Sequence, residues 1–569
     1  MKRRLTLTLL LLAAGIMTAY AARAPRLPKG CTIYGTVTCD GEAMQGVVVS
    51  DGRAIAITDT KGRYFINSDK RNGTVFVSIP SCTEVPCEYG MPHFWEPLGT
   101  DATPEEHNFT LTARENNEHA VIAISDVHLA NVFDDQEQFD GIFMPRLREE
   151  VEKYRSRGIP VYCINAGDSS YDRYWFEDMY TIDDFVATMK YNDFPVPMFP
   201  TMGNHDNDGS TSFSAETDFN ASARYRRAMG PTHYSFNIGK VHYIMLDNVV
   251  YLNSPGRIDS YEGITGRRDY EVYVTDDQLE WLRRDLETIS DRSTPVVVTM
   301  HVPTMTYKGK GIVTKFKCTA TGAEAKMKEF TAIFKDFEQV HFITGHTHKN
   351  LTCHGADDTS TYPDIANIID HNITGVCGCW WQTRAHAGLS LSTDSAPSGF
   401  EVFPVSGKSL EWYFVSNDDG ADHQFRVFDM NSVRDYYTHN GEMRSFIKQY
   451  PLRTDYSKIE DNMIYVHVWA WEPGWKISVT ENGRPLEVNA KSIENPQYTI
   501  SYHLPRASWD DNGTERWQDR YNKPSRTDHF FVARASSPTS TIVVTVTDGF
   551  GHSWTETVGR PKRFSKLMR

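Results

Sequence analysis

The sequence predicts a central α/β domain flanked by an N-terminal and a C-terminal β-sandwich domain. In the middle of the chain, short apolar strands alternate with helices, which is the pattern of a layered α/β domain. On both sides, short runs of β-branched and aromatic residues are separated by turn signals such as Asp-Gly, which is typical of β-rich domains. We place the three domains at residues 25–116, 117–370 and 371–569.

Residues 1–21 have the features of a signal peptide. Three basic side chains among the first four residues precede a nearly unbroken apolar run from Leu5 to Ile16. The run is short for a membrane span, and Ala19-Tyr20-Ala21 offers small residues at the cleavage spacing. We therefore expect a periplasmic or secreted protein with no transmembrane segment after cleavage.

The N-terminal domain is expected to be structural. Thr32–Val37 and Val47–Ser50 are strand-like, and a turn at Gly62 joins two further strand candidates. No catalytic constellation is found in this segment, so a structural or spacer module is the preferred interpretation.

Nine cysteines leave at least one thiol unpaired. In an exported chain Cys31 could pair with Cys39, or Cys82 with Cys87. The alternative is that most cysteines are small buried apolar residues.

Six strands are expected in the central domain, each ending near a polar motif. They cover residues 120–125, 160–165, 196–202, 241–246, 295–300 and 339–344. One helix is predicted over 143–155. A second follows Thr275–Gln278, which fits a capping box, and presents Leu279, Leu282 and Leu286 on one face.

The C-terminal domain is expected to be a β-sandwich. Its strand candidates cover residues 400–403, 410–415, 463–469, 475–480 and 541–547, and Asn482-Gly483 and Asp548-Gly549 are turn signals.

Five motifs rich in Asp, His and Asn fall at the carboxyl ends of predicted strands. They are Asp126-Val127-His128, Gly167-Asp168, Gly203-Asn204-His205-Asp206, His301 and Gly345-His346-Thr347-His348. Ligands of open α/β sheets bind outside those strand ends, so position and chemistry agree. Asp-x-His and Gly-Asp are common and weak alone, whereas Gly-Asn-His-Asp and Gly-His-Thr-His are more specific. All five in this order indicate metal-assisted hydrolysis of a phosphate ester.

The residue types are those of a two-metal site. Two cations about 3.5–4 Å apart need a bridging ligand and a mixed shell of ligands. Asp168 can supply the bridging carboxylate and Asn204 a neutral oxygen. Such a mixed oxygen and nitrogen site suits two divalent transition metal ions, with manganese, iron, zinc and nickel as candidates.

With these motifs the chain resembles the calcineurin-like metallophosphoesterase family over roughly residues 118–350. The resemblance implies a four-layered α/β sandwich and attack by a metal-bound hydroxide. It implies one metal held by Asp126, His128, Asp168 and His348, and a second held by Asp168, Asn204, His301 and His346. His205 would act at the phosphoryl oxygens or the leaving group, with Asp206 orienting its ring. The flanking β domains are similar to those of three-part exported bacterial phosphoesterases.

A purple acid phosphatase is the alternative within the enzyme class. Gly167-Asp168-Ser169-Ser170-Tyr171 also fits the pattern in which a tyrosine binds ferric iron. Those enzymes lack a histidine at the position of His128. We therefore favour Tyr171 as a packing residue near the metal ligands.

A tryptophan pair, Trp380-Trp381, could line the substrate cleft or only seal a domain interface, and both interpretations stay open. His242, His341, His354 and His386 fit no ligand position and are expected to be structural or exposed.

The net charge of −15 argues against nucleic acid as a partner, because sequence-independent affinity for a phosphate backbone needs a basic surface. A small phosphorylated substrate is compatible with this charge, since bound cations reverse the local field. A rival hypothesis from another class is a metal-holding binding or adhesion protein without turnover. The sequence leaves the oligomeric state and the choice between monoester and diester open.

Overall fold

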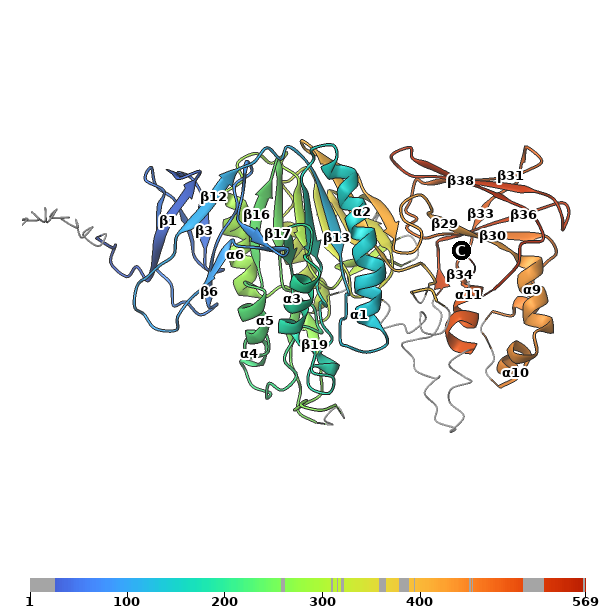
Figure 1. The fold of residues 1–569 in the computed structure, drawn as a ribbon, viewed down its shortest axis with the longest axis horizontal. Helices are drawn as coiled ribbons and strands as arrows, with labels where there is room; N and C mark the ends of the chain where they lie inside the picture. The colour runs from blue at the N-terminus through green and yellow to red at the C-terminus, as the bar shows by residue number, and fades with distance from the viewer. Residues whose placement is uncertain are drawn as a thin grey trace, which may run out of the picture.

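The computed structural model describes residues 26–256, 261–308, 311–314, 316–318, 322–357, 365–377, 388–392, 394–449, 452, 454–504, 526–565 and 568. Figure 1 shows three parts that follow one another along the long axis, coloured from blue to red. The predicted signal peptide, Trp380, Trp381 and His386 lie outside the described residues. No helix of the described part is long and apolar enough to span a bilayer.

The N-terminal part consists of two packed sheets. The first contains β1 (Ile33–Cys39), β2 (Glu42–Ala43), β5 (Arg63–Ile66), β7 (Thr83–Glu84), β11 (Glu105–Glu106) and β12 (Phe109–Ala113). The second contains β3 (Val48–Ser50), β4 (Ile55–Ile57), β6 (Thr74–Val77) and β10 (Trp95–Pro97). The predicted β-sandwich is therefore present. Cys31, Cys39, Cys82 and Cys87 are free thiols, so the disulfides considered from the sequence are not formed.

The core of this module continues into the central domain. Phe76 is fully buried and its ring lies 6.2 Å from that of Tyr234 and 6.3 Å from that of Trp281. Phe94 likewise packs against Phe199, with 5.8 Å between ring centroids. The module is therefore a packed part of the central fold rather than a separate spacer.

Two six-stranded sheets form the centre of the molecule. The first contains β13 (Glu118–Ile124), β14 (Val161–Asn165), β15 (Met198–Pro200), β26 (Gly399–Ser406), β27 (Ser409–Leu410) and β28 (Tyr413–Ser416). The second contains β16 (Tyr234–Ile238), β17 (Val241–Met245), β20 (Val296–Thr299), β23 (Val340–Thr344), β24 (Leu351–His354) and β25 (Ile368–Asn372). The six strands predicted from the sequence for this domain are thereby confirmed, with shifts of one or two residues at their ends.

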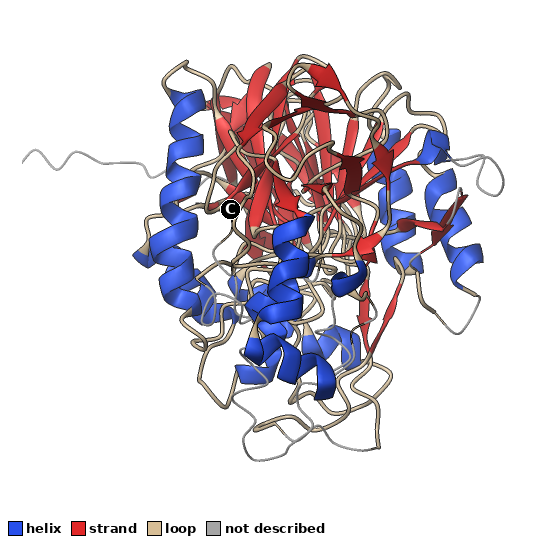
Figure 2. Cartoon of the chain, turned by 90° about the vertical axis from the view of Figure 1, so that its right-hand side faces the viewer, coloured by secondary structure: helices blue, strands red, loops and turns tan. Residues whose placement is uncertain are grey.

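Helices cover the outer face of each sheet. Along β13, Ile122 packs against α2 (Met144–Arg155) and α3 (Ile182–Tyr191), whereas Val121 belongs to the core between the sheets. The second sheet packs against α6 (Asp276–Glu287) and α7 (Ala323–Ala332). Figure 2 shows helices on either side of the stacked strands. This arrangement is the expected four-layered α/β sandwich.

After residue 371 the chain first returns to the central sandwich. β26 pairs antiparallel with β13 over six residues, and β28 pairs with β26. The strand candidates at 400–403 and 410–415 therefore belong to the central sandwich. The local pattern of a strand does not reveal which strand it pairs with. Here β26 pairs with β13, which lies about 280 residues earlier in the chain.

The predicted capping box at the start of α6 is also absent. Thr275 is the N-cap residue, but its side chain accepts no capping hydrogen bond. Gln278 instead donates to the carbonyl of Asp247 at 2.8 Å and accepts from its N–H at 3.1 Å. The buried side chain of Gln278 thus satisfies the N–H and the carbonyl of Asp247, just after β17 ends. Because buried polar groups need hydrogen-bond partners, Gln278 makes these contacts instead of capping the helix.

The C-terminal part is β-rich, as expected, with helices at one side. One sheet contains β29 (Phe425–Asp429), β30 (Met463–Val468), β33 (Asn489–Ala490) and β36 (Phe530–Arg534). The other contains β31 (Lys476–Glu481), β32 (Arg484–Pro485), β37 (Ile542–Thr547) and β38 (Ser553–Val558). Helices α9 (Met430–His439) and α10 (Gly441–Gln449) pack on the first sheet.

Candidate metal centre

The seven predicted metal ligands meet at one edge of the central sandwich. Each follows the carboxyl end of a parallel strand: Asp126 and His128 follow β13, Asp168 follows β14, Asn204 follows β15, His301 follows β20, and His346 and His348 follow β23. Five of them have left-handed backbone, with φ of 51° at Asp126, 46° at His128, 54° at Asp168, 67° at His346 and 56° at His348. Such conformations are uncommon outside glycine and concentrate at functional sites.

Two glycines allow the motif loops to approach one another. A Cβ atom at Gly203 would lie 2.2 Å from the backbone nitrogen of Asp168. One at Gly345 would lie 1.7 Å from Oγ of Ser125 and 2.5 Å from Oδ2 of Asp126. The sequence therefore needs glycine at both positions so that the ligand side chains can share one site.

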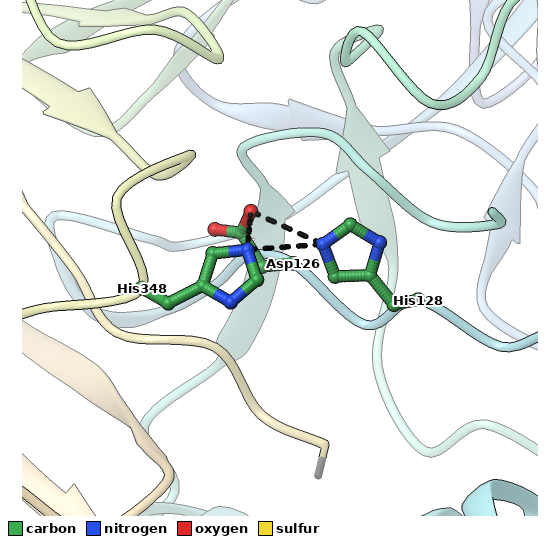
Figure 3. A group of neighbouring side chains, drawn as sticks. All are labelled: Asp126, His128 and His348. Atoms are coloured by element: carbon green, nitrogen blue, oxygen red, sulfur yellow. Dashed lines mark hydrogen bonds and ion pairs between the residues drawn. The ribbon is translucent and has the colours of Figure 1, made fainter. Parts of the chain in front are cut away.

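The first ligand cluster consists of Asp126, His128 and His348 (Figure 3). Nε2 of His348 lies 3.0 Å from Oδ1 of Asp126 and 3.1 Å from Nε2 of His128. Nε2 of His128 lies 3.6 Å from the same carboxylate oxygen. All three side chains are buried, and their donor atoms converge on one point.

The second cluster consists of Asp168, His301 and His346, with Asn204 beside them. Nε2 of His301 lies 3.0 Å from both Oδ2 of Asp168 and Oδ1 of Asn204. Nδ1 of His346 lies 2.8 Å from the same amide oxygen. This group offers a carboxylate, an amide oxygen and two imidazole nitrogens.

Asp168 lies between the two clusters. Its Oδ2 is 3.0 Å from Nε2 of His301 and 3.7 Å from Nε2 of His128. Its other oxygen, Oδ1, accepts a hydrogen bond from the backbone N–H of His205 at 2.7 Å. One carboxylate therefore contacts both groups of ligands while the Asn204–His205 loop holds it in place.

Neighbouring groups orient the imidazoles of the second cluster. Nδ1 of His301 donates to the carbonyl of Ala166 at 2.8 Å, so Nε2 faces Asp168 and Asn204. His346 has the opposite orientation, because its Nε2 lies 3.4 Å from the hydroxyl of Tyr270 and its Nδ1 faces the cluster. Partners of this kind fix the orientation of metal-binding histidines.

Burial and neighbouring charges shift the pKa values of the imidazoles at this edge in opposite directions. Burial lowers the pKa of His301, but the attraction of Asp168 outweighs it and raises that pKa to about 9. Burial, together with repulsion from His301, lowers the pKa of His346 to about 3. The buried carboxylate of Asp168 therefore favours positive charge on His301.

The side chains fit a pair of transition-metal ions. Nε2 of His128 and Nε2 of His348 face each other, and two imidazole lone pairs in this position need a cation or a proton between them. The mixture of carboxylate, amide oxygen and imidazole donors is suited to manganese, iron, zinc or nickel. Each cluster supplies at least three donors.

His205 lies beside the first cluster and is oriented by a carboxylate that the sequence did not reveal. Its ring is 5.2 Å from that of His128, and its Nδ1 lies 2.7 Å from Oδ1 of Asp172. The same oxygen accepts from Nη1 of Arg268 at 2.8 Å. Asp172 is almost fully buried, whereas His205 and Arg268 are each 16% exposed.

The expectation that Asp206 orients the His205 ring is wrong. Oδ2 of Asp206 accepts from the backbone N–H of Gly203 at 2.9 Å, and Oδ1 accepts from that of Ser170 at 3.0 Å. Burial, then repulsion from Asp168, raises the pKa of Asp206 to about 6. Asp206 therefore ties the Gly203–Asp206 loop to the Asp168–Ser170 loop. Its position next to His205 in the sequence was misleading, because its carboxylate serves backbone N–H groups whereas the His205 ring bonds to Asp172.

Tyr171 packs edge-on against two site histidines. Its ring lies 5.3 Å from that of His128 and 4.5 Å from that of His205, and the residue is 8% exposed. The ring supports both imidazoles, in keeping with the packing role proposed from the sequence. Iron binding by the Tyr171 hydroxyl, the alternative considered from the sequence, stays a prediction.

Sequence reasoning missed Asp172, Arg268 and Tyr270. Asp172 lies four residues after Asp168. The only sequence signal for it is the Asp172-Arg173 pair that follows the Gly167-Asp168 motif. Arg268 lies in the loop between β18 (Val249–Tyr251) and β19 (Tyr270–Val272), and Tyr270 is the first residue of β19. Neither position carries a recognisable signal. Tertiary packing alone brings both residues to the site.

Three histidines that fit no ligand position are engaged elsewhere. His242 lies 2.8 Å from Asp285, His341 lies 2.9 Å from His371, and His354 pairs with Glu472 of the C-terminal part at 2.7 Å.

Three family models match consecutive parts of the chain. The N-terminal part of calcineurin-like phosphoesterases matches residues 31–114, the calcineurin-like phosphoesterase model matches 119–350, and the C-terminal part matches 370–554. The order and extent of the matches agree with the three-part layout. A search of curated proteins finds no matching relative.

Solved structures with a similar fold are distant. The purple acid phosphatase PPD1 from yellow lupin (Lupinus luteus) seeds is 13% identical with a TM-score of 0.34, and the match covers 66% of this chain and 72% of that one. PhoD is 11% identical with a TM-score of 0.34, over 75% and 85%. GAP50, the anchor in the inner membrane complex of Plasmodium, is 12% identical with a TM-score of 0.29, over 53% and 86%. Similarity at this level carries no inference about activity.

Proposed function

Because the chain belongs to the calcineurin-like phosphoesterase family, we propose that it hydrolyses phosphate esters at a dinuclear metal centre. The observation that carries this proposal is the position of Asp168 between two clusters of histidine and carboxylate ligands. Asp126, His128, Asp168 and His348 would hold one ion, and Asp168, Asn204, His301 and His346 the other. The two ions, when bound, stabilise charge on phosphoryl oxygens and lower the pKa of a bound water.

The side chains of this protein position the substrate and move a proton. Nδ1 of His205 donates to Asp172, and this fixes the ring so that Nε2 would meet a phosphoryl or leaving-group oxygen. Arg268 donates to the same carboxylate oxygen and balances its charge. Tyr270 and Ala166 keep two ligand imidazoles in the required orientation. Pre-organisation of this kind lowers the barrier without rearrangement during the reaction.

The test combines metal analysis with a substrate panel. The purified protein is loaded separately with manganese, iron, zinc and nickel, and assayed on phosphomonoesters and phosphodiesters. We expect about two ions per chain and turnover of at least one substrate. Asp168→Asn should lose both metal and activity, and His205→Ala should lose activity while retaining metal.

Asp291→Asn is the matched control, because Asp291 pairs with Lys408 at the surface. Bound metal without turnover of any phosphate ester would reject the enzyme proposal and favour a metal-holding binding protein.

We further propose that the protein is exported. This rests on the basic start, the apolar run from Leu5 to Ile16 and the small residues at Ala19-Tyr20-Ala21. Amino-terminal sequencing of the mature protein from a bacterial host with a periplasm tests it. A mature chain beginning near Ala22 supports export, and an intact Met1 would contradict it.

A further inference from the structure

A cavity of about 440 Å³ lies between the central sandwich and the C-terminal part, beside the loop that carries His346 and His348. On the central side it is lined by Thr347, Lys349 and Asn372, and on the other side by Trp471, Arg526 and His529. Its volume is within the range of small-molecule sites, which commonly form where domains meet.

The wall of the cavity is joined to the ligand loop. Thr347 lies between two predicted metal ligands, and its hydroxyl donates to Oδ1 of Asn372. Nδ2 of Asn372 donates to the carbonyl of Gly345. A molecule in this cavity would therefore contact the same segment that presents His346 and His348.

The charges around the cavity balance. Lys349 and Arg526 contribute two positive charges, and Asp394 and Asp528 two negative charges. A strongly charged occupant would gain attraction from one pair and meet repulsion from the other. A neutral polar occupant meets hydrogen-bonding groups of both kinds, and hydroxyl groups suit such a wall because each one both donates and accepts.

One aromatic ring forms a firm platform in this wall. Trp471 is half-buried and is braced edge-on by His529, at 5.9 Å, and by Phe531, at 5.5 Å. His529 is 3% exposed. A flat apolar face beside polar groups is the combination that binds a ring carrying hydroxyl groups.

We propose that this cavity receives the leaving group of the phosphate ester, and that this group is a hydroxyl-bearing ring, a sugar or a nucleoside. The inference rests on the proposed phosphoesterase activity. The C-terminal part thereby contributes to substrate selection through Trp471.

The experiment compares substrates matched in ring size. Glucose 6-phosphate is compared with cyclohexylmethyl phosphate, which keeps a six-membered ring but lacks the hydroxyls, and adenosine 5′-monophosphate represents the nucleoside source. We expect kcat/KM at least about tenfold higher for a hydroxylated substrate, since a site built for hydroxyls rejects an analogue without them. Trp471→Ala should raise KM for that substrate about tenfold and leave cyclohexylmethyl phosphate within about twofold.

Trp554→Ala is the matched control, because this tryptophan belongs to β38 of the same domain and does not line the cavity. Calorimetric titration with glucose and with adenosine, on wild type and Trp471→Ala, gives a readout that needs no turnover. Equal effects of Trp471→Ala on all substrates, or no binding of either compound to the wild type, would overturn the inference. Absence of hydrolysis of every phosphate ester would instead reject the phosphoesterase proposal.

Discussion

At the scale of single residues, the site depends on backbone that few residues adopt and on contacts that sequence neighbours do not make. Five of the seven proposed ligand residues have positive φ, and His205 is oriented by Asp172 rather than by the adjacent Asp206. Motifs identify which residue types are present, but the direction of each side chain follows from the loop in which it lies. Substitutions can separate the role of the backbone conformation from that of the side-chain contacts.

Asp172→Asn should reduce kcat about 100-fold and leave metal content unchanged, because a positioned proton-transfer group typically contributes this much. The substitution keeps the size of the side chain but removes the charge that His205 and Arg268 share. Steady-state kinetics and metal analysis provide the measurement. Asp193→Asn, at an exposed position, is the control, and loss of metal in Asp172→Asn would contradict a positioning role.

Gly345→Ala should abolish binding of the metal that we propose Asp126 holds. The added Cβ would overlap Oγ of Ser125 and displace Oδ2 of Asp126. Gly549→Ala serves as the control, because a Cβ there meets no atom of the described residues within 4 Å. Full metal occupancy in Gly345→Ala, measured by mass spectrometry, would show that the loop relaxes without cost.

Tyr171→Phe should leave the optical spectrum of the iron-loaded protein unchanged, because the ring packs against His128 and His205 in a supporting role. A visible absorption band in the wild type that disappears in this variant would instead assign Tyr171 as an iron ligand.

At the scale of secondary-structure elements, single buried side chains join the two sheets. His119 on β13 donates from Nδ1 to the carbonyl of Asn116 at 2.9 Å, and its Nε2 accepts from the hydroxyl of Tyr243 on β17 at 2.8 Å. The ring is 1% exposed. A neutral imidazole satisfies both contacts, whereas a protonated one loses the acceptor.

This contact predicts a pH dependence of stability. Burial lowers the pKa of His119 to about 4 from an ordinary value near 6.5. Between these values the unfolded chain binds the proton and the folded chain does not, so stability falls as pH drops from about 6.5 to about 4. A shift of this size corresponds to about 3 kcal/mol. Denaturant titration across the range should show a shallower slope in His119→Gln.

His439→Gln is the control for this measurement, because His439 is 73% exposed and should not alter the slope. An unchanged slope in His119→Gln would mean that other buried groups, such as His341, account for the acid sensitivity.

At the scale of the whole molecule, the three parts are joined by continuous packing. The N-terminal core shares its aromatic residues with the second central sheet. On the other side, β26 and β28 bring the chain back to β13 before the C-terminal sandwich begins. This connection places Trp471 and His529 beside the ligand loop.

Phe76→Ala should destabilise the central domain as well as the N-terminal module, by about 3–5 kcal/mol, which is typical of truncating a buried aromatic residue. Its ring packs against Tyr234 and Trp281 of the central domain. Thermal unfolding followed together with bound metal tests this. Phe65→Ala, at a half-buried position of the same module, is the control. Separate unfolding of the module with the metal site intact would contradict a shared core.

The sequence by itself determined the fold class and the residues available for the site. Apolar strands that end in Asp, His and Asn imply a sheet edge rich in metal ligands. The strands are recognised from local periodicity, and the ligands from the order of the motifs. It also predicted the six central strands closely, from Ala120–Ser125 to Gln339–Thr344.

Only the tertiary structure decided the contacts between segments distant in the chain. Asp172, Arg268 and Tyr270 come to the site through tertiary packing, and β26 pairs with β13, which lies about 280 residues earlier in the chain. The capping box at Thr275 fails for the same reason, because Gln278 serves the buried backbone of Asp247. Buried backbone N–H and C=O groups need hydrogen-bond partners. When these partners come from distant segments, no local sequence pattern reveals them.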